Sequence, residues 1–208
     1  MLHAAPGRGV ERVVLSGRTV ALKWRHDRAT DREALLYQTL TPAVTQALGC
    51  PRPLGAVTIG STHLLFLEWV EGTRMNWRDP HHVHLAFTHL GRLHRTTAAL
   101  IAQTPRGLAS GEAYAELFPE PYPPGQEPLV LDPGDLHADN FLLTTDDNVH
   151  LLDFENMAVR PRAVALRQLR DDPSLPRGAL ADLALSAYWR AAGWRDDGTR
   201  FRARVLGG

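Results

Sequence analysis

The sequence predicts an α+β protein of two lobes, with a small β-rich N-terminal lobe and a mainly helical C-terminal lobe. Short apolar strand patterns separated by Gly-containing turns occupy the chain up to residue 70. Helical periodicity follows, over residues 82–101 and again over residues 178–192. The chain has 208 residues and 44% hydrophobic composition, enough for one domain or for two small lobes that share a cleft. We therefore expect lobes at residues 1–70 and 71–208.

The first lobe is predicted from two pairs of strands with a helix between them. Residues 10–15 and 19–23 read as strands joined by a turn that contains Gly17. A helix is expected over residues 27–40, because the pattern ends at a Thr-Pro pair that disfavours helix. Two further strands are expected at residues 54–59 and 64–70. In the second lobe, a further helix is expected over residues 163–170.

The most informative motif surrounds Asp135. It places Asp135, Asn140 and Asp153 in order, and apolar runs at residues 141–143 and 149–152 flank a polar turn cluster. This pattern predicts a β-hairpin whose first strand begins directly after Asn140 and whose second strand ends directly before Asp153. The two residues would then lie side by side. Each residue taken singly could instead cap a turn, as Asp and Asn often do. The ordered set favours phosphoryl transfer, which needs a carboxylate for the nucleophile's proton and Mg²⁺ held by oxygen ligands.

A lone lysine in the first lobe has the chemistry to complete such a site. The chain has 23 lysine and arginine residues, and Lys23 is the only lysine. An ammonium is a compact point charge that can reach phosphate oxygens in a confined cleft. Glu33, one turn into the expected helix, is a candidate partner for it, and Asp31 is a competing one. The plain alternatives are a surface lysine and a first-turn glutamate that complements the helix dipole.

These motifs resemble the aminoglycoside phosphotransferase and choline kinase-like family of small-molecule kinases, which share the protein-kinase-like fold. The resemblance implies an ATP- and Mg²⁺-dependent phosphotransferase that moves the γ-phosphate to a hydroxyl of a small molecule. It implies that Lys23 positions phosphates and Glu33 orients Lys23, and that backbone groups of Glu68 and Val70 bind adenine. It further implies that Asp135 accepts or orients the hydroxyl proton, and that Asn140 and Asp153 bind Mg²⁺. The matching positions are Gly134, Asp135, His137, Asn140, Asp153, Phe154 and Glu155.

The chain also departs from the family pattern. Pro133 replaces the first histidine of the family loop, and only Gly7, Arg8 and Gly9 are available as a phosphate loop before the first strand. An aspartate that normally ties down the family's catalytic loop is missing from residues 163–166. These departures, with the short second lobe, leave a second hypothesis open. It is a degenerate kinase-fold module that binds a nucleotide or a protein without turnover.

The acceptor is not identified by these motifs. Aminoglycosides are polycations and need acidic walls, whereas the charged residues that follow Glu155 are all arginine up to residue 170. The residues of that kind are Arg160, Arg162, Arg167 and Arg170. Acidic side chains of the preceding connector are the candidates to compensate, namely Glu112, Glu116, Glu120 and Glu127.

Composition and charge limit the kinds of binding partner that we expect for this chain. The net charge is +0 and no long basic run occurs, so we expect no nucleic-acid binding. No apolar stretch of about 18 residues and no signal-like N-terminus is present, so we expect a cytoplasmic protein without membrane contact. Cys50 is the only cysteine, which excludes an internal disulfide. A group of histidines between residues 81 and 94 raises a third reading, a metal protein, but solvated or packed histidines are favoured. The oligomeric state stays open.

Overall fold

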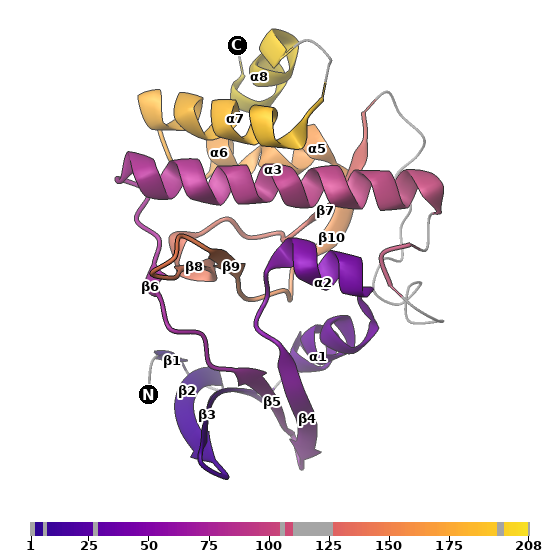
Figure 1. Cartoon of the computed structure of the whole chain (residues 1–208), viewed down its shortest axis with the longest axis vertical. Coiled ribbons are helices and arrows are strands. Elements are labelled where there is room, and N and C mark those ends of the chain that lie inside the picture. Colours follow the sequence, from indigo (N-terminus) through magenta and orange to yellow (C-terminus); the bar gives the residue numbers. More distant parts are fainter. Residues whose placement is uncertain are drawn as a thin grey trace.

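A computed structural model of the chain describes residues 3–5, 8–26, 29–104, 107–109, 127–194 and 198–207. An antiparallel sheet forms the N-terminal region and a group of helices forms the C-terminal region (Figure 1). The α+β class expected from the sequence is therefore confirmed. None of the helices in these described ranges is both long enough and apolar enough to span a membrane.

The N-terminal sheet has five strands in the order β1-β2-β3-β5-β4, all antiparallel. The β2–β3 hairpin turns at Ser16 and Gly17, whose φ angles of 49° and 76° suit the tight turns that match strand twist. Strand β1 was not predicted. It lies ahead of the first strand that the sequence predicted. The strands are β1 (His3–Ala5), β2 (Arg8–Leu15), β3 (Arg18–Arg25), β4 (Pro53–Ile59) and β5 (Thr62–Glu68).

Two helices connect β3 to β4. Helix α1 (Ala29–Thr39) packs against β3, β4 and β5, and α2 (Pro42–Leu48) packs against α3 (Pro80–Gln103). The sequence predicted only the first of them and took Pro42 as its end. Pro42 instead begins α2, since proline is favoured in the first turn, and Gly49 ends it with a φ of 60°.

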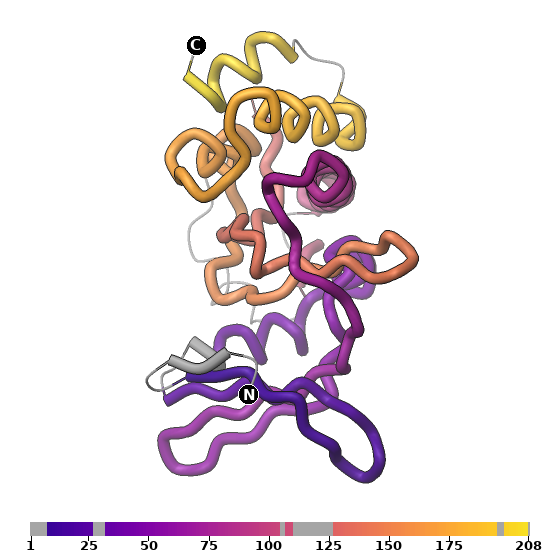
Figure 2. Tube along the Cα trace, turned by 90° about the vertical axis from the view of Figure 1, so that its left-hand side faces the viewer, coloured from indigo at the N-terminus to yellow at the C-terminus, as the bar shows by residue number. Residues whose placement is uncertain are grey.

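An extended segment after β5 connects the sheet to the helical region (Figure 2). Strand β5 ends at Glu68, two residues earlier than expected, and the chain then forms β6 (Thr73–Arg74). This short strand pairs with β8 (Phe141–Leu143), which in turn pairs with β9 (Val149–Leu151). The hairpin predicted after Asn140 is thus confirmed as β8 and β9.

The helical region is organised around α3 (Pro80–Gln103) and α7 (Ala179–Ala192), which lie against each other in Figure 1. Asp79 caps α3 by accepting a hydrogen bond from the backbone N–H of His81, and Pro80 occupies its first turn. Gly91 allows the close approach, because a Cβ there would lie 2.5 Å from the carbonyl oxygen of Tyr188 on α7. Both long helices were predicted within a few residues of their observed bounds.

The remaining elements surround the residues of the Asp135 motif. Strands β7 (Leu129–Asp132) and β10 (Ala158–Pro161) pair with each other, and neither was predicted. The helix expected over residues 163–170 is broken into α5 (Arg162–Leu166) and α6 (Gln168–Asp171). Helix α8 (Gly198–Leu206), also not predicted, packs on α5 and α6.

Candidate active site

Lys23 lies at the centre of the site. It belongs to β3, the middle strand of the sheet, and is only 9% exposed. Its Nζ lies 2.6 Å from Oε2 of Glu33 on α1 and 2.9 Å from Oδ1 of Asp153, which follows β9. The pairing of Lys23 with Glu33 was predicted from the sequence, and the contact of Lys23 with Asp153 adds a third residue at the same point.

The two carboxylates keep Lys23 protonated. Burial alone would lower the pKa of Lys23, but the carboxylates of Glu33 and Asp153 outweigh it and raise that pKa above its ordinary value. Glu33 is 1% exposed, and its Oε1 accepts a hydrogen bond of 3.4 Å from the backbone N–H of Phe154. Lys23 is therefore an ammonium at neutral pH. Of its two anionic partners, Asp153 is the one that reaches solvent, with 35% of its side chain exposed.

Asp153 has a backbone conformation that is uncommon for a side chain other than glycine. Its φ is 59°, in the left-handed region. Its neighbours hold it there, because Phe154 is fully buried and its ring packs 5.3 Å from that of Tyr37 on α1. Glu155 forms an ion pair with Arg25 of β3. Such a local distortion, fixed by the packing of the residues that follow it, is a frequent property of functional sites.

The segment of residues 133–140 between β7 and β8, hereafter the Asp135 loop, needs a glycine at its sharpest point. Gly134 has a φ of 87°, and a Cβ there would lie 2.1 Å from the carbonyl oxygen of Asn156. The backbone N–H of Gly134 donates to Oδ1 of Asp132 at 3.1 Å, and the other oxygen of Asp132 pairs with Arg160. Burial raises the pKa of Asp132, although Arg160 and the Gly134 N–H oppose this.

Asp135 and Asn140 are both held by backbone hydrogen bonds of the loop and the hairpin. Asp135 Oδ1 accepts a hydrogen bond of 3.0 Å from the backbone N–H of His137, which fixes the carboxylate in a local turn. Asn140 ends the 3₁₀ turn η1 (Ala138–Asn140). Its carbonyl accepts a 2.8 Å hydrogen bond from the backbone N–H of Leu152, the residue before Asp153. Asn140 and Asp153 therefore lie side by side, as the predicted hairpin requires.

Three contacts that the sequence did not reveal join the Asp135 loop to α6 and to the residues that follow α6. Oε1 of Gln168, the first residue of α6, accepts a 3.1 Å hydrogen bond from the backbone N–H of Leu136. His137 Nε2 lies 3.0 Å from Oδ2 of Asp172, and its Nδ1 lies 3.1 Å from the hydroxyl of Ser174. Gln168 stands two residues beyond the stretch in which an aspartate was missing. Its side chain thus connects α6 to the Asp135 loop.

Glu68 and Val70 lie where the sheet leads into the extended segment. The backbone N–H of Glu68 donates to the carbonyl of Arg52 at 2.8 Å, so this N–H is already used within the fold. Val70 lies beyond the end of β5 and is half-buried. Arg12 of β2 stacks on the intervening Trp69, with the guanidinium carbon 4.8 Å from the ring centroid.

Other residues named from the sequence have structural roles or lie outside the described ranges. Gly7 and the acidic residues Glu112, Glu116 and Glu120 fall outside the described residues. Gly9 belongs to β2, and a Cβ there would lie 2.8 Å from the ring of Trp24, which gives this glycine a packing reason. Glu127 pairs with Arg204 of α8 and accepts a hydrogen bond of 3.1 Å from the backbone N–H of Ala163. It is therefore engaged in the helical region.

His89 and His94 of α3 contact different partners and not each other. His89 Nε2 lies 3.0 Å from the carbonyl oxygen of Leu48, and burial lowers the pKa of His89. His94 is fully buried, and its Nδ1 lies 2.9 Å from the hydroxyl of Tyr188. Burial lowers the pKa of His94 to about 3. These contacts support packed histidines over a shared metal site.

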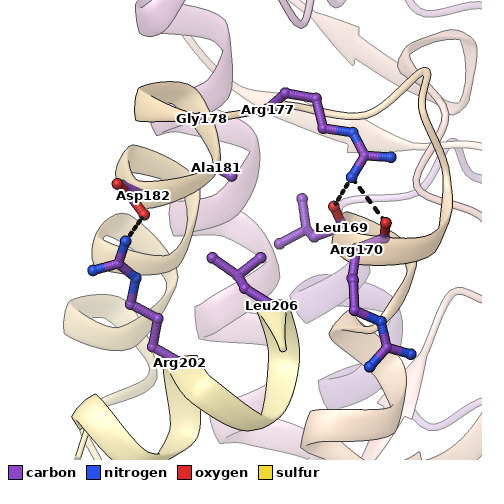
Figure 3. Close-up of a pocket in the computed structure, with 8 residues that line it drawn as sticks. All are labelled: Leu169, Arg170, Arg177, Gly178, Ala181, Asp182, Arg202 and Leu206. Atoms are coloured by element: carbon purple, nitrogen blue, oxygen red, sulfur yellow. Dashed lines mark hydrogen bonds and ion pairs between the residues drawn. The ribbon is translucent and has the colours of Figure 1, made fainter. Parts of the chain in front are cut away.

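Two pockets border the helices behind the Asp135 loop. The larger has a volume of 560 Å³ and includes Gly134 in its wall. The smaller, 270 Å³, lies among α6, α7 and α8 (Figure 3). In that smaller pocket Arg177 donates to the carbonyls of Leu169 and Arg170, and Arg202 pairs with Asp182. Its cationic side chains are thus largely used to join the helices.

Solved structures share this fold, although no family sequence model and no curated protein matches the chain by sequence. An aminoglycoside phosphotransferase from Alicyclobacillus acidocaldarius superposes with a TM-score of 0.65 at 17% identity, covering 98% of this chain and 76% of that one. An aminoglycoside-3'-phosphotransferase of type VIII gives 0.60 at 21% identity, covering 98% and 89%. A thermostable mutant of aminoglycoside phosphotransferase APH(4)-Ia, in ternary complex with AMP-PNP and hygromycin B, gives 0.60 at 15% identity, covering 99% and 81%. The chain therefore has the protein-kinase-like fold of the aminoglycoside phosphotransferases, and the resemblance drawn from its motifs is confirmed at the level of the fold.

Proposed function

We propose that the chain is an ATP- and Mg²⁺-dependent phosphotransferase that moves the γ-phosphate of ATP to a hydroxyl of a small molecule. The observation that carries this proposal is the contact of Lys23 with both Glu33 and Asp153, at 2.6 and 2.9 Å. It joins a cation from the sheet, a buried carboxylate from α1 and a half-exposed carboxylate beside the Asp135 loop. A protein that only needed a stable core would gain little from burying the charges of Lys23 and Glu33.

Residues 1–70 would form the nucleotide-binding lobe and residues 71–208 the lobe that holds the metal and the acceptor. Lys23 would contact the α- and β-phosphates, since its ammonium is held in place by Glu33 while Asp153 is free to exchange partners. The carbonyl of Glu68 and the backbone of Val70 would bind adenine. The neighbour structure with AMP-PNP, a nucleotide analogue, supports ATP as the donor in the same fold.

Asn140 and Asp153 would hold Mg²⁺. Their donors are oxygens, the type that Mg²⁺ prefers, and the hydrogen bond between the Leu152 N–H and the Asn140 carbonyl sets the two residues side by side. Two protein ligands are suitable for Mg²⁺, because this ion usually completes its coordination with water and substrate phosphates. The bound ion would neutralise charge on the phosphates.

Asp135 would act on the acceptor. Its carboxylate is fixed by the His137 N–H at 3.0 Å, and 34% of the side chain remains exposed. A fixed and accessible carboxylate can orient a hydroxyl in line with the γ-phosphate and accept its proton.

Turnover in matched variants tests the proposal against a binding module without catalysis. We expect the purified protein to transfer phosphate from ATP to at least one member of a panel of hydroxylated metabolites in the presence of Mg²⁺. Asp135→Asn should nearly abolish transfer and leave nucleotide binding unchanged. Asp139→Asn, an exposed aspartate of the same loop, is the control. Nucleotide binding without transfer to any acceptor would favour the binding module, and full activity of Asp135→Asn would refute the assigned role.

A further inference from the structure

The 560 Å³ pocket lies against the Asp135 loop on the side of α5 and α6. Gly134, the neighbour of Asp135, forms part of its wall, and so does Asp172, whose partner His137 lies 3.9 Å from Oδ1 of Asp135. The volume is within the range of about 300 to 1,000 Å³ that is usual for small-molecule sites. The pocket is therefore suitably placed and sized for a small acceptor of the phosphotransferase proposed above.

Most charged groups that line this pocket are already engaged. Arg160 pairs with buried Asp132. Asp171 accepts a hydrogen bond of 2.6 Å from Arg170. Asp172 is held by Ser174, whose backbone N–H and hydroxyl donate at 2.8 and 2.7 Å, and these bonds lower its pKa.

Arg167 is the exception among the charged residues of this wall. It lies at the junction of α5 and α6 with an exposed side chain, and it forms no ion pair within the described part of the chain. The lining contains two arginines and two aspartates, and Arg167 is the one of these four whose charge is not engaged in such a contact. A guanidinium binds an anion through paired charge-assisted hydrogen bonds, so this residue favours an anionic ligand.

We propose that this pocket binds the acceptor, and that the acceptor is a small hydroxylated molecule with an anionic group, carboxylate or phosphate, that contacts Arg167. This inference rests on the proposed phosphotransferase function and specifies its substrate class. In the reaction, the acceptor hydroxyl oxygen forms a bond to the γ-phosphorus of ATP, and the bond from that phosphorus to the β–γ bridging oxygen breaks. ADP leaves, and the hydroxyl proton passes to Asp135.

The test compares acceptors that differ only in charge. Glycerol, glycerate and glycerol 3-phosphate form one series, and glucose, gluconate and glucose 6-phosphate form another, with kanamycin as a polycation. ADP release is measured with Mg²⁺ for the wild type, Arg167→Ala, Arg167→Lys and Arg92→Ala, a control for an exposed arginine on α3. We expect kcat/KM to be about tenfold or more higher for an anionic member than for its neutral counterpart, the size of one charge-assisted contact.

The variants separate recognition from chemistry. Arg167→Ala should raise KM for the anionic acceptor by about tenfold or more with kcat retained, Arg167→Lys should be intermediate, and Arg92→Ala should match the wild type. The better of the carboxylate and phosphate arms identifies the anionic group. Turnover of neutral or cationic acceptors that equals or exceeds that of the anionic ones overturns the inference and leaves the phosphotransferase function standing.

Direct binding decides the case in which no acceptor turns over. Glycerol 3-phosphate, gluconate and glucose 6-phosphate are titrated calorimetrically into protein with ADP and Mg²⁺. Binding that is weakened about tenfold or more by Arg167→Ala and not by Arg92→Ala supports the anion pocket and counts against the phosphotransferase function instead. No binding of any of these probes overturns the inference.

Discussion

The buried pair of Lys23 and Glu33 makes an asymmetric prediction about stability. Glu33 is 1% exposed, and Lys23 is its only ionic partner among the described residues. Lys23, in contrast, also contacts Asp153 at 2.9 Å. Removing the lysine therefore leaves a buried carboxylate without a counter-charge, whereas removing the carboxylate leaves the lysine with one partner.

The magnitudes follow from this difference. Lys23→Met should cost about 3 to 5 kcal/mol, the usual cost of stranding one member of a buried pair. Glu33→Gln should cost about 2 kcal/mol, because Asp153 still compensates Lys23 and the amide oxygen can still accept from Phe154 N–H. The double variant should be more stable than Lys23→Met alone, since neither side chain is then charged.

Thermal and urea unfolding of the four proteins measures these differences. For a chain of this length each kcal/mol corresponds to about 2 to 4 °C, so Lys23→Met should lower Tm by roughly 6 to 20 °C and Glu33→Gln by roughly 4 to 8 °C. A double variant less stable than Lys23→Met would refute the reasoning, as would Glu33→Gln costing more than Lys23→Met.

Three further predictions concern the surroundings of the site. Because burial lowers the pKa of His94 to about 3 from 6.5, the unfolded state binds the extra proton between these values. The free energy of unfolding should therefore fall by about 2 kcal/mol more from pH 7 to pH 5 in the wild type than in His94→Asn, and equal losses in urea titrations would contradict this. The buried hydroxyl of Tyr37 has no hydrogen-bond partner in the described ranges, so Tyr37→Phe should raise the urea midpoint by an amount equivalent to about 1 kcal/mol, and a lower midpoint would be the opposite result. Gly134→Ala should unfold the Asp135 loop and abolish turnover, whereas Gly60→Ala, with a φ of 61° and open space at its Cβ, should cost only about 1 kcal/mol; equal effects would refute the steric argument.

The sequence predicted the parts of the fold that have strong local signals. The β2–β3 hairpin contains a glycine turn, and the long helices have clear apolar periodicity. It missed β7 and β10, which are only four residues each and pair residues that are 26 or more positions apart in the sequence. It also missed α2, because Pro42 has two opposite local meanings, the end of one helix and the start of the next.

The site was predicted to a similar extent. Lys23 contacts Glu33, and the hairpin places Asn140 next to Asp153, as the sequence predicted, whereas the contact of Lys23 with Asp153 was not predicted. The tether from Gln168 to Leu136 N–H was not predictable, since it depends on where α5 breaks at Arg167. The pairing of Asp132 with Arg160 likewise results from the register of β7 and β10, which no local pattern reveals.

Mg²⁺-dependent nucleotide binding is the most direct test of a metal and phosphate site at Lys23 and Asp153. A fluorescent ATP analogue is titrated into the wild type, Asp153→Asn and the control Asp139→Asn, each with Mg²⁺ and with EDTA. We predict that Mg²⁺ tightens binding to the wild type and the control, and that Asp153→Asn loses about tenfold or more of the affinity measured with Mg²⁺. Binding that is unaffected by both Mg²⁺ and the Asp153 substitution would contradict the assignment of this site.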